Sequence, residues 1–487
     1  MQYMPMTSSM FLIAETREQP MHVGGLQLFV PREGQTAHEL ADEVHAAFTS
    51  PDMTISETFR RRPAQPFSLV GSLAWSVDDD IDMAYHVRRI ALPSPGRIRE
   101  LFHYVSLNHS TLLDRSRPMW EAHIIEGLAD GRAALYTKVH HSLVDGVTAM
   151  RLLARTLSED PANRQCTAPW DAKLRKRSGA LAEPIRAILD QEHTADRGLL
   201  GNLRKQIGKQ VNAAADIGKQ VAGLVPAAGH VAWKAMNDED FVSPGTFAPR
   251  SMFDVPIGSA RRFAADQWSV SRMKKVADAL GVTINDVVLA MCSSALRTYM
   301  IENGSLPDDP LVAMIPVSMH VGDADDGNAV SAVMANLATN DPDPAARLKK
   351  LVASMNASKN VIRGLQPIQA LALGAATIAP LAFMSIPGFV NYTPPQFNLI
   401  ISNVPGPKNQ MYWNGAKLDG CYPVSIATSG NALNITLTSE ADQIGFGLIG
   451  ARAQLPSLQR LLDYLEEGLV ELEGVAQVTD QRGDQQS

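Results

Sequence analysis

Two adjacent histidines, an aspartate and a glycine form the segment of this sequence that is best suited to chemistry. They occupy residues 140–146, with the sequence HHSLVDG. An imidazole has a pKa near neutrality, so a histidine at the edge of a cleft can take a proton from an alcohol. An aspartate on the adjoining loop can cap backbone amides or pair with a basic residue without accepting that proton. The segment therefore predicts a general base, with His141 as the candidate.

Three other interpretations of this segment stay open. A hydrogen-bonded pair of core histidines before a helix-capping aspartate would give the same pattern. A metal site of His140, His141 and Asp145 is disfavoured, because adjacent strand residues point to opposite faces. A covalent route through serine or cysteine is disfavoured too, since the sequence has no G-x-S-x-G elbow. The same alternation gives the histidines different tasks, with His140 supporting His141.

A strand, a tight turn and a helix must position these residues. Residues 133–141 alternate in hydrophobicity as a strand does, with Val139 and His141 on one face. Gly146 breaks this pattern and permits the turn, after which apolar residues recur at helical spacing. Strands and helices alternate up to about residue 160 and again from about residue 253. This alternation predicts an α/β fold.

Two segments depart from the alternation. Residues 171–252 begin with a basic cluster and continue as an amphipathic pattern, which predicts a helical connector; contact with a membrane surface or with CoA phosphates stays open. Residues 364–407 carry no charged side chain. Prolines at 367, 380 and 387 interrupt this second stretch, so it predicts a buried core or a lipid-facing surface rather than a membrane-spanning helix.

Composition limits the classes of function. The chain has 487 residues, enough for two domains and a connector. Its net charge is −7, which does not favour a nucleic-acid partner. The three cysteines are far apart and odd in number, so they predict neither a disulfide framework nor a metal site. The first twenty residues lack the pattern of a signal peptide. A cytoplasmic protein is expected.

Four motifs in a fixed order resemble those of the wax ester synthase/acyl-CoA:diacylglycerol acyltransferase family. Residues 140–146 resemble its HHxxxDG motif, and residues 113–121 (LDRSRPMWE) its LDRxRPLWE segment, with Met119 where Leu is usual. Asn285-Asp286 resembles its ND motif, and residues 402–407 (SNVPGP) its SNVPGP turn. The opening strand around residue 22 is similar as well, so the resemblance runs from about residue 8 to 469.

The resemblance implies two α/β domains like chloramphenicol acetyltransferase with a channel between them. The bounds implied are 1–170, a helical connector at 171–252, a second domain at 253–472 and a flexible tail at 473–487. It also implies direct transfer. His141 deprotonates a bound hydroxyl, the alkoxide attacks the thioester of acyl-CoA, and CoA leaves as the thiol. His140, Asp145 and Gly146 complete the catalytic segment.

The other motifs contribute further candidates. Asn285 is the candidate for hydrogen bonding to the oxyanion or for ordering the site. Thr283 and Asp286 also fit a capping box at a helix start, so Asp286 has a structural alternative. Candidates for the lining of the substrate channel come from three motifs, and each also has a structural alternative as a core, capping or rigid-loop residue: Pro118, Trp120, Asp286, Ser402, Asn403 and Gly406.

One motif is set aside. Residues 445–450 match the G-x-G-x-x-G pattern of dinucleotide sites, but they lie inside a predicted hairpin at 433–450 that turns at 441–443. They do not follow a strand and open a helix, so no nucleotide site is expected.

The function expected from these residues is O-acyl transfer from acyl-CoA to a long-chain fatty alcohol or diacylglycerol. Acyl-CoA is then a co-substrate, and no cofactor or metal is expected. A different hydroxyl acceptor, or a lipid-binding relative without catalysis, stays open. Peripheral association with the inner face of the membrane or with lipid inclusions is compatible with apolar substrates.

Overall fold

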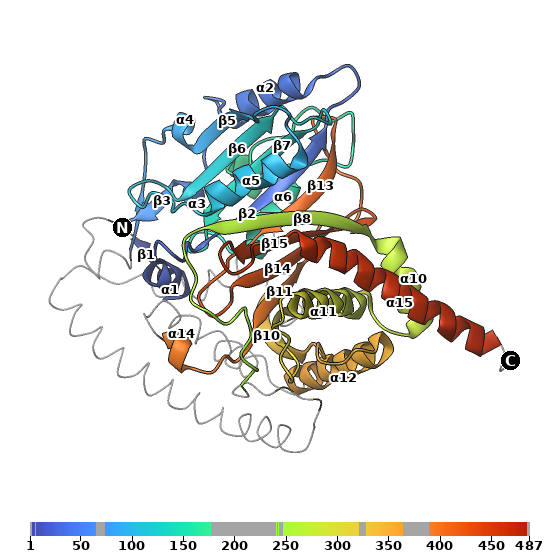
Figure 1. The fold of residues 1–487 in the computed structure, drawn as a ribbon. Coiled ribbons are helices and arrows are strands. Elements are labelled where there is room, and N and C mark those ends of the chain that lie inside the picture. The colour runs from blue at the N-terminus through green and yellow to red at the C-terminus, as the bar shows by residue number, and fades with distance from the viewer. Residues whose placement is uncertain are drawn as a thin grey trace.

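Two six-stranded sheets form the framework of the protein. The computed structural model describes residues 2–4, 6–64, 74–176, 240, 242, 247–320, 328–363 and 389–484. The two sheets lie one above the other in Figure 1, and a three-stranded sheet lies at one edge. The upper sheet has the order β12 (Tyr412–Trp413), β13 (Ala416–Val424), β2 (His22–Val30), β7 (Ala133–His140), β6 (Trp120–Glu126) and β5 (Val87–Ala91). The lower sheet has the order β10 (Asn328–Asn336), β9 (Val312–His320), β11 (Leu399–Val404), β14 (Leu433–Glu440), β15 (Gln443–Ala451) and β8 (Arg261–Ser269). The small sheet has the order β1 (Gln2–Tyr3), β4 (Ala74–Val77) and β3 (Arg61–Pro63).

Helices pack on both sheets. Those of the first half are α1 (Met6–Ala14), α2 (Ala37–Phe48), α3 (Glu57–Arg60), α4 (Met83–His86), α5 (Ile98–His109), α6 (Gly146–Arg155) and α7 (Ala172–Lys176). Those of the second half are α10 (Val270–Leu280), α11 (Ile284–Glu302), α12 (Pro344–Arg363), α14 (Phe389–Tyr392) and α15 (Arg460–Asp484). The predicted α/β fold is confirmed.

β7 lies in the middle of the upper sheet and is buried on both faces. It runs antiparallel to β2 and β6, with His140 opposite His22 and Val139 opposite Trp120. Helices α2 and α6 cover the face that bears Val139, and α5 covers the face that bears Tyr136. The strand predicted at 133–141 is therefore present, and it ends one residue early, at His140.

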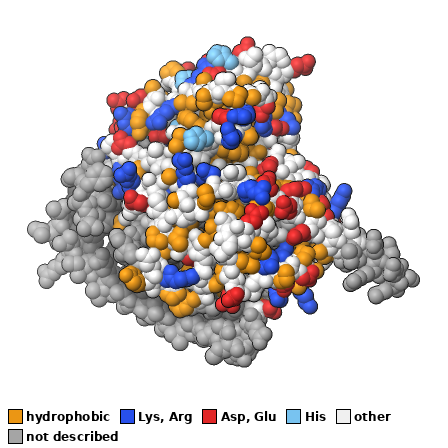
Figure 2. All heavy atoms as spheres, viewed as in Figure 1, with side chains coloured by type: hydrophobic (Ala, Val, Ile, Leu, Met, Phe, Trp, Pro, Cys, Tyr) orange, Lys and Arg blue, Asp and Glu red, His pale blue; other side chains and the backbone are white. Residues whose placement is uncertain are grey.

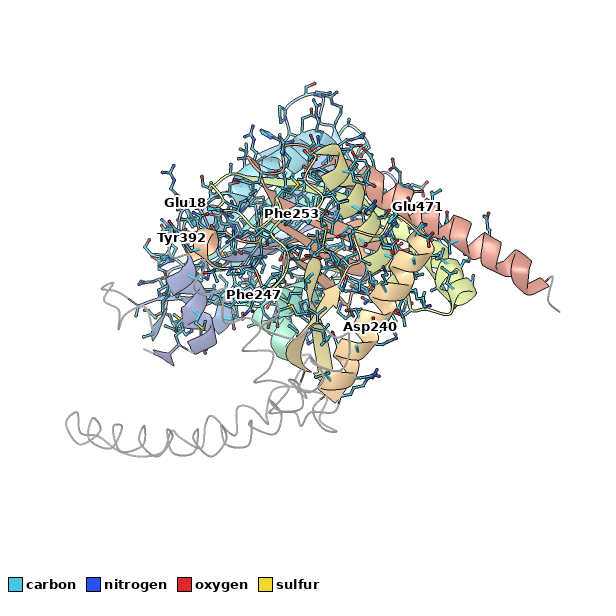
Figure 3. All side chains as sticks on the ribbon, turned by 60° about the horizontal axis from the view of Figure 1, so that its bottom comes forward. Glu18, Asp240, Phe247, Phe253, Tyr392 and Glu471 are labelled. Carbon is cyan, nitrogen blue, oxygen red and sulfur yellow. The ribbon has the colours of Figure 1, made fainter. Side chains whose placement is uncertain are left out.

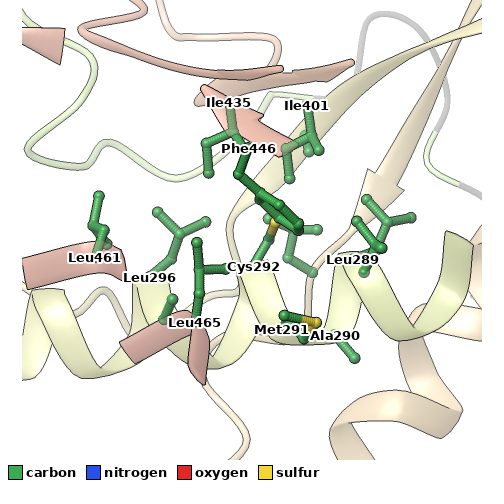
Figure 4. Close-up of a cluster of buried hydrophobic side chains, with 14 of the residues drawn as sticks. Leu289, Ala290, Met291, Cys292, Leu296, Ile401, Ile435, Phe446, Leu461 and Leu465 are labelled. Carbon is green, nitrogen blue, oxygen red and sulfur yellow. The ribbon is translucent and has the colours of Figure 1, made fainter. Parts of the chain in front are cut away.

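The lower sheet buries the largest core of the protein. Phe446 of β15, with Ile435 and Ile401 of the neighbouring strands, packs on leucines of α11 and α15 (Figure 4). Helix α11 is buried along most of its length. Phe253, just before this half begins, is fully buried in the same core and lies inside the molecule in Figure 3.

One strand crosses between the two halves of the sequence. β13 pairs antiparallel with β2, from Lys417 opposite Val30 to Val424 opposite Gly24. The predicted bounds assign residues 412–424 to the second domain, but their hydrogen bonds place them in the upper sheet. Alternating hydrophobicity predicts a strand but not the sheet that the strand joins, because the pattern is the same in either sheet.

The glycines of the G-x-G-x-x-G match have a packing role. They lie in β15, within the predicted hairpin, which turns between Glu440 and Gln443. A Cβ on Gly445 would lie 2.2 Å from the carbonyl oxygen of Cys421, and one on Gly447 would lie 1.8 Å from that of Pro423. Glycine is therefore required because the backbone of β13 crosses β15 at this point.

Several other predictions can be compared with the structure. Helix α15 continues past the predicted boundary at 472 to Asp484, because one glycine at 474 costs a helix only about 1 kcal/mol. The amphipathic connector at 177–239 and the uncharged stretch at 364–388 lie outside the described residues. Among the described helices, no single one is long and apolar enough to cross a membrane. The pair α10 and α11 would pass by length and composition, with a bend of 100° between its members.

Charged side chains of both signs are mixed on the surface. On the face shown in Figure 2, basic and acidic groups lie close to one another over both sheets. Many of them form pairs; Arg272, for example, bridges Glu466 and Glu473 between α10 and α15. Such exposed pairs contribute little to stability individually.

We expect Gly447→Ala to destabilise the fold. The added Cβ would overlap the backbone carbonyl of Pro423, which cannot move without shifting β13. Overpacking of this kind costs about 1–3 kcal/mol. Gly474→Ala, on α15 with open space around it, is the matched control and should be neutral or slightly stabilising. Urea unfolding of both variants checks this, and equal stabilities would contradict the crossing.

Candidate active site

The end of β7 fixes both histidines of the motif. The backbone N–H of His140 donates to the carbonyl of Met119, just before β6, over 2.9 Å, and that of His141 donates to the carbonyl of Met21, just before β2, also over 2.9 Å. His140 is fully buried. Its Nδ1 accepts the backbone N–H of Ser142 at 3.1 Å and lies 2.6 Å from the Ser142 hydroxyl. The different tasks expected for the two histidines therefore correspond to different environments.

His141 follows the strand and lies in apolar surroundings. The ring of Phe11, from α1, stacks on its imidazole at 3.9 Å between centroids and 19° between planes. Nδ1 is buried and has no hydrogen-bond partner on any other described residue. Desolvation lowers the pKa of His141 to about 4, although the charge of Asp145 and the residue's own backbone carbonyl favour the protonated form. The ring is therefore unprotonated near neutral pH, as a general base must be.

Asp145 and Gly146 begin helix α6. Asp145 is the N-cap, and its Oδ1 accepts the backbone N–H of Thr148 at 2.7 Å. This is the capping task expected for an aspartate on this loop. Gly146 is the first helical residue and has no positive φ, so the turn does not require glycine, contrary to expectation. A Cβ at Gly146 would meet nothing within 4 Å.

Trp120 and Pro118 lie directly beside β7. The indole N–H of Trp120 donates to the carbonyl of Phe59 at 2.8 Å, and the ring packs on Trp170 and His86 at 4.4 Å each. Trp120 also lines a small, mostly apolar cavity between β7 and α6. It is thus a core residue that faces a cavity. Pro118 is buried at the start of the same strand. Contact with an acyl chain stays a prediction for both.

The SNVPGP segment approaches helix α6. Val404, at the end of β11, packs in one cluster with Met150 and Leu153 of α6. Ser402 is half-buried on β11, and Asn403 is exposed. A Cβ on Gly406 would lie 1.9 Å from the carbonyl oxygen of Ser439, so glycine is required there by a close backbone contact. The structure therefore brings this motif near the histidine motif, while its role in substrate binding stays a prediction.

The ND motif lies at the start of α11. Thr283 and Asp286 form the capping box, with the Thr283 hydroxyl 2.7 Å from Asp286 Oδ2. The structural alternative for Asp286 is thus present. Asn285 is half-buried, and no hydrogen bond in the described parts of the chain joins it to His140 or His141. Its role at the oxyanion stays a prediction, as does the channel between the domains.

A column of buried polar side chains lies under the motif, between the upper sheet and α5. His22 Nε2 lies 2.9 Å from the carbonyl of His109, whose Nδ1 lies 2.8 Å from the Tyr136 hydroxyl. Desolvation lowers the pKa of His109 to about 3. Lys138 donates to the carbonyls of Asn108 and Thr111 at 3.0 Å each, and desolvation lowers its pKa to about 8. These pairs satisfy groups that burial would otherwise penalise.

Three residues near the site were not identified from sequence. Phe11 covers one face of His141, Glu15 lies 3.3 Å from His140, and Arg115 pairs with Glu15 at 2.9 Å. Arg115 belongs to the LDRxRPLWE-like segment, and the resemblance of that segment is the sequence feature that could have identified it. No cluster of three metal-ligating side chains occurs in the described parts of the chain.

We expect Asp145→Ala to cost about 1 kcal/mol of stability, whereas Asp145→Asn should cost much less. Asparagine retains a side-chain oxygen for the Thr148 amide, and alanine does not. Chemical unfolding of the two variants measures the difference. If asparagine were as damaging as alanine, the charge of Asp145, rather than its cap, would be what stabilises the protein.

Comparison with known proteins follows the same lines. Residues 4–288 match the family model of the wax ester synthase/diacylglycerol acyltransferase catalytic domain, and residues 326–473 match that of the WS/DGAT C-terminal domain. A Mycobacterium tuberculosis protein named "probable diacylglycerol O-acyltransferase" is 46% identical over 97% of this chain and 99% of its own. The O-acyltransferase WSD of Acinetobacter baylyi is 40% identical over 96% and 95%, respectively.

Solved structures agree with this assignment. The wax ester synthase/diacylglycerol acyltransferase of Marinobacter aquaeolei VT8 has 40% identity and a TM-score of 0.74, covering 98% of this chain and all of its own. The first condensation domain of the calcium-dependent antibiotic synthetase, at 15% identity and a TM-score of 0.54, covers 98% of this chain and 96% of its own, and shares the fold alone. The chain belongs to the wax ester synthase/diacylglycerol acyltransferase family.

Proposed function

We propose that this protein transfers a long-chain acyl group from acyl-CoA to the hydroxyl of a fatty alcohol or diacylglycerol. The observation that carries the proposal is the imidazole of His141 directly after β7, which stacks on Phe11 and has a buried Nδ1 with no partner on any other described residue. The names of the relatives, diacylglycerol O-acyltransferase and wax ester synthase, support both acceptors.

The mechanism that we propose uses His141 as the base. Its ring nitrogen takes the hydroxyl proton as the alcohol oxygen attacks the thioester carbonyl, and the tetrahedral intermediate then expels CoA, which leaves as the thiol. The negative charge of Asp145 favours the imidazolium formed in this step. The stacked Phe11 ring excludes water from one face of the imidazole, which limits hydrolysis of the thioester.

The setting that we propose follows from the substrates. Diacylglycerols and wax esters are insoluble, so the protein would work in the cytoplasm at the inner face of a membrane or at lipid inclusions. The transfer as written balances without a metal or cofactor, so acyl-CoA and the acceptor are the only reactants proposed. Exposed Ile13 of α1 and Tyr392 of α14, which is labelled at one edge of the molecule in Figure 3, are compatible with contact to lipid.

We expect His141→Ala to reduce thiol release from palmitoyl-CoA at least about 1000-fold with either hexadecanol or dioleoylglycerol, since the base is lost. His38→Ala, at an exposed position on α2, is the control and should retain full activity. Free thiol measured against time checks both. If the unmodified protein released thiol only with other hydroxyl acceptors, the alternative of a different acceptor would be favoured. If it released no thiol with any alcohol, the alternative of a lipid-binding protein without catalysis would be favoured.

We expect kcat/KM to stay level from about pH 8 down to about pH 5 and to fall as the pH drops through about 4. The pKa of His141 is lowered to about 4, and protonation below that value removes the lone pair that accepts the proton. Activity should return when the sample is brought back to pH 7. A midpoint near 6.5, the ordinary value for histidine, would mean that water reaches the ring and would contradict its desolvation.

A further inference from the structure

A buried carboxylate outside the histidine motif contacts the supports of both histidines. Glu15 directly follows α1, and its side chain is 1% exposed. One oxygen, Oε1, accepts the backbone N–H of Met21 at 3.0 Å and lies 3.3 Å from His140 Nε2. The other, Oε2, accepts from Arg115 at 2.9 and 3.2 Å. Two hydrogen-bond donors, the Met21 amide and Arg115, therefore meet at one carboxylate, and His140 Nε2 faces the same carboxylate at 3.3 Å without hydrogen-bond geometry.

The first link fixes the ring of His140. Its Nδ1 accepts the backbone N–H of Ser142, so that nitrogen carries no proton. The ring proton is then on Nε2, which faces Glu15. The carboxylate thus favours this tautomer and this ring orientation, which in turn hold the loop that follows β7.

The second link reaches the backbone of His141. Met21 donates its N–H to Glu15 and accepts the N–H of His141 on its own carbonyl, at 2.9 Å. A displacement of Glu15 would therefore move the peptide unit that holds His141 in line with β2.

The third link reaches the ring of His141 through α1. The backbone N–H of Glu15 donates to the carbonyl of Phe11, and Phe11 stacks on His141. Arg115 donates to the carbonyl of Leu12 at 2.8 Å as well as to Glu15. The pair of Glu15 and Arg115 thereby holds the end of α1 against the imidazole.

The charge of Glu15 is stabilised where it lies. Burial alone would raise its pKa, but hydrogen bonds and charge from His140, the Met21 amide and Arg115 hold the pKa below its ordinary value. The site therefore contains a carboxylate anion that does not contact the place of reaction.

We propose that Glu15 is a positioning residue of the proposed acyl transfer, acting mainly through His140 and held in place by Arg115. This rests on the proposed function of His141. Groups that orient the ligands of a metal site typically change activity about 10–100-fold without contacting substrate, and we expect an effect of the same order from Glu15. The sequence motif that contains Arg115 thus connects to the chemistry through α1.

The test begins with Glu15→Gln, which keeps the volume and removes the charge. The amide nitrogen of the new glutamine is a donor, and it would face either the Met21 and His140 nitrogens or Arg115, which are donors too. At least one contact of the residue 15 side chain is therefore lost. We expect kcat to fall about 10–100-fold while KM for palmitoyl-CoA stays within about twofold. Glu43→Gln is the matched control, because Glu43 also pairs with an arginine and an amide, on α2, and it should leave kcat unchanged.

A double-mutant cycle with His140→Ala identifies the route. If Glu15 acts through His140, Glu15→Gln should lower kcat by less than about threefold once His140 is gone. Equal losses in both backgrounds, or kcat within about twofold of the unmodified protein for Glu15→Gln alone, would overturn the proposal. Glu15→Asp is the second variant should the glutamine form fail to fold. It keeps the charge but withdraws the carboxylate from His140, and the same two outcomes decide.

The cycle is also run on thermal unfolding, so that failure of the inference and failure of the proposed function remain distinct. If the unmodified protein releases no thiol, the proposed function fails. The change that Glu15→Gln makes to the midpoint of thermal unfolding then still tests the contact between Glu15 and His140. A smaller change in the His140→Ala background supports that contact, and an equal change overturns it.

Discussion

Holding the partly buried imidazole of His141 directly after a central strand is the constraint on which the rest of this site depends. Desolvation lowers the pKa of His141 to about 4, but burial also penalises every polar group around it. Neighbouring residues offset that penalty. The Nδ1 atom of His140 accepts the Ser142 amide and its Nε2 faces Glu15, and the backbone amides of both histidines are paired with the segments before β6 and before β2. The buried column that includes His109 and Lys138 continues the same pairing under the sheet.

The crossing strand β13 makes this local arrangement a property of the whole molecule. β13 pairs with β2, which pairs with β7, so the strand that precedes His141 is two strands away from a segment that the second half supplies. The backbone of β13 can also lie across β15 only because Gly445 and Gly447 have no side chains. Helix α6 can then pack on β11 from the second half. The two halves are consequently bound by backbone hydrogen bonds as well as by side-chain packing.

Local patterns in the sequence were sufficient for several of the elements and for some of the residues at their ends. Alternation predicted β7, the T-x-x-D spacing predicted the capping box of Asp286, and the hairpin of β14 and β15 followed from its turn. Contacts between distant segments were not predicted. β13 alternates as any strand would, and Glu15 and Arg115 are 100 residues apart, so nothing local connects them. Gly146 shows the opposite case, because the glycine was predicted but the backbone reason given for it was not the one observed.

The segment 113–121 illustrates why a motif can be recognised before its physical role is known. Its resemblance suggested an acyl pocket, yet its residues perform three separate structural tasks. Arg115 binds the end of α1, the carbonyl of Met119 accepts the His140 amide, and Trp120 fixes its indole on Phe59 beside a cavity. The first two tasks hold α1 and the backbone of His140, and the third packs the strand beside β7. A substitution at Arg115 would therefore shift α1 and the imidazole that Phe11 covers even where it leaves substrate contacts intact.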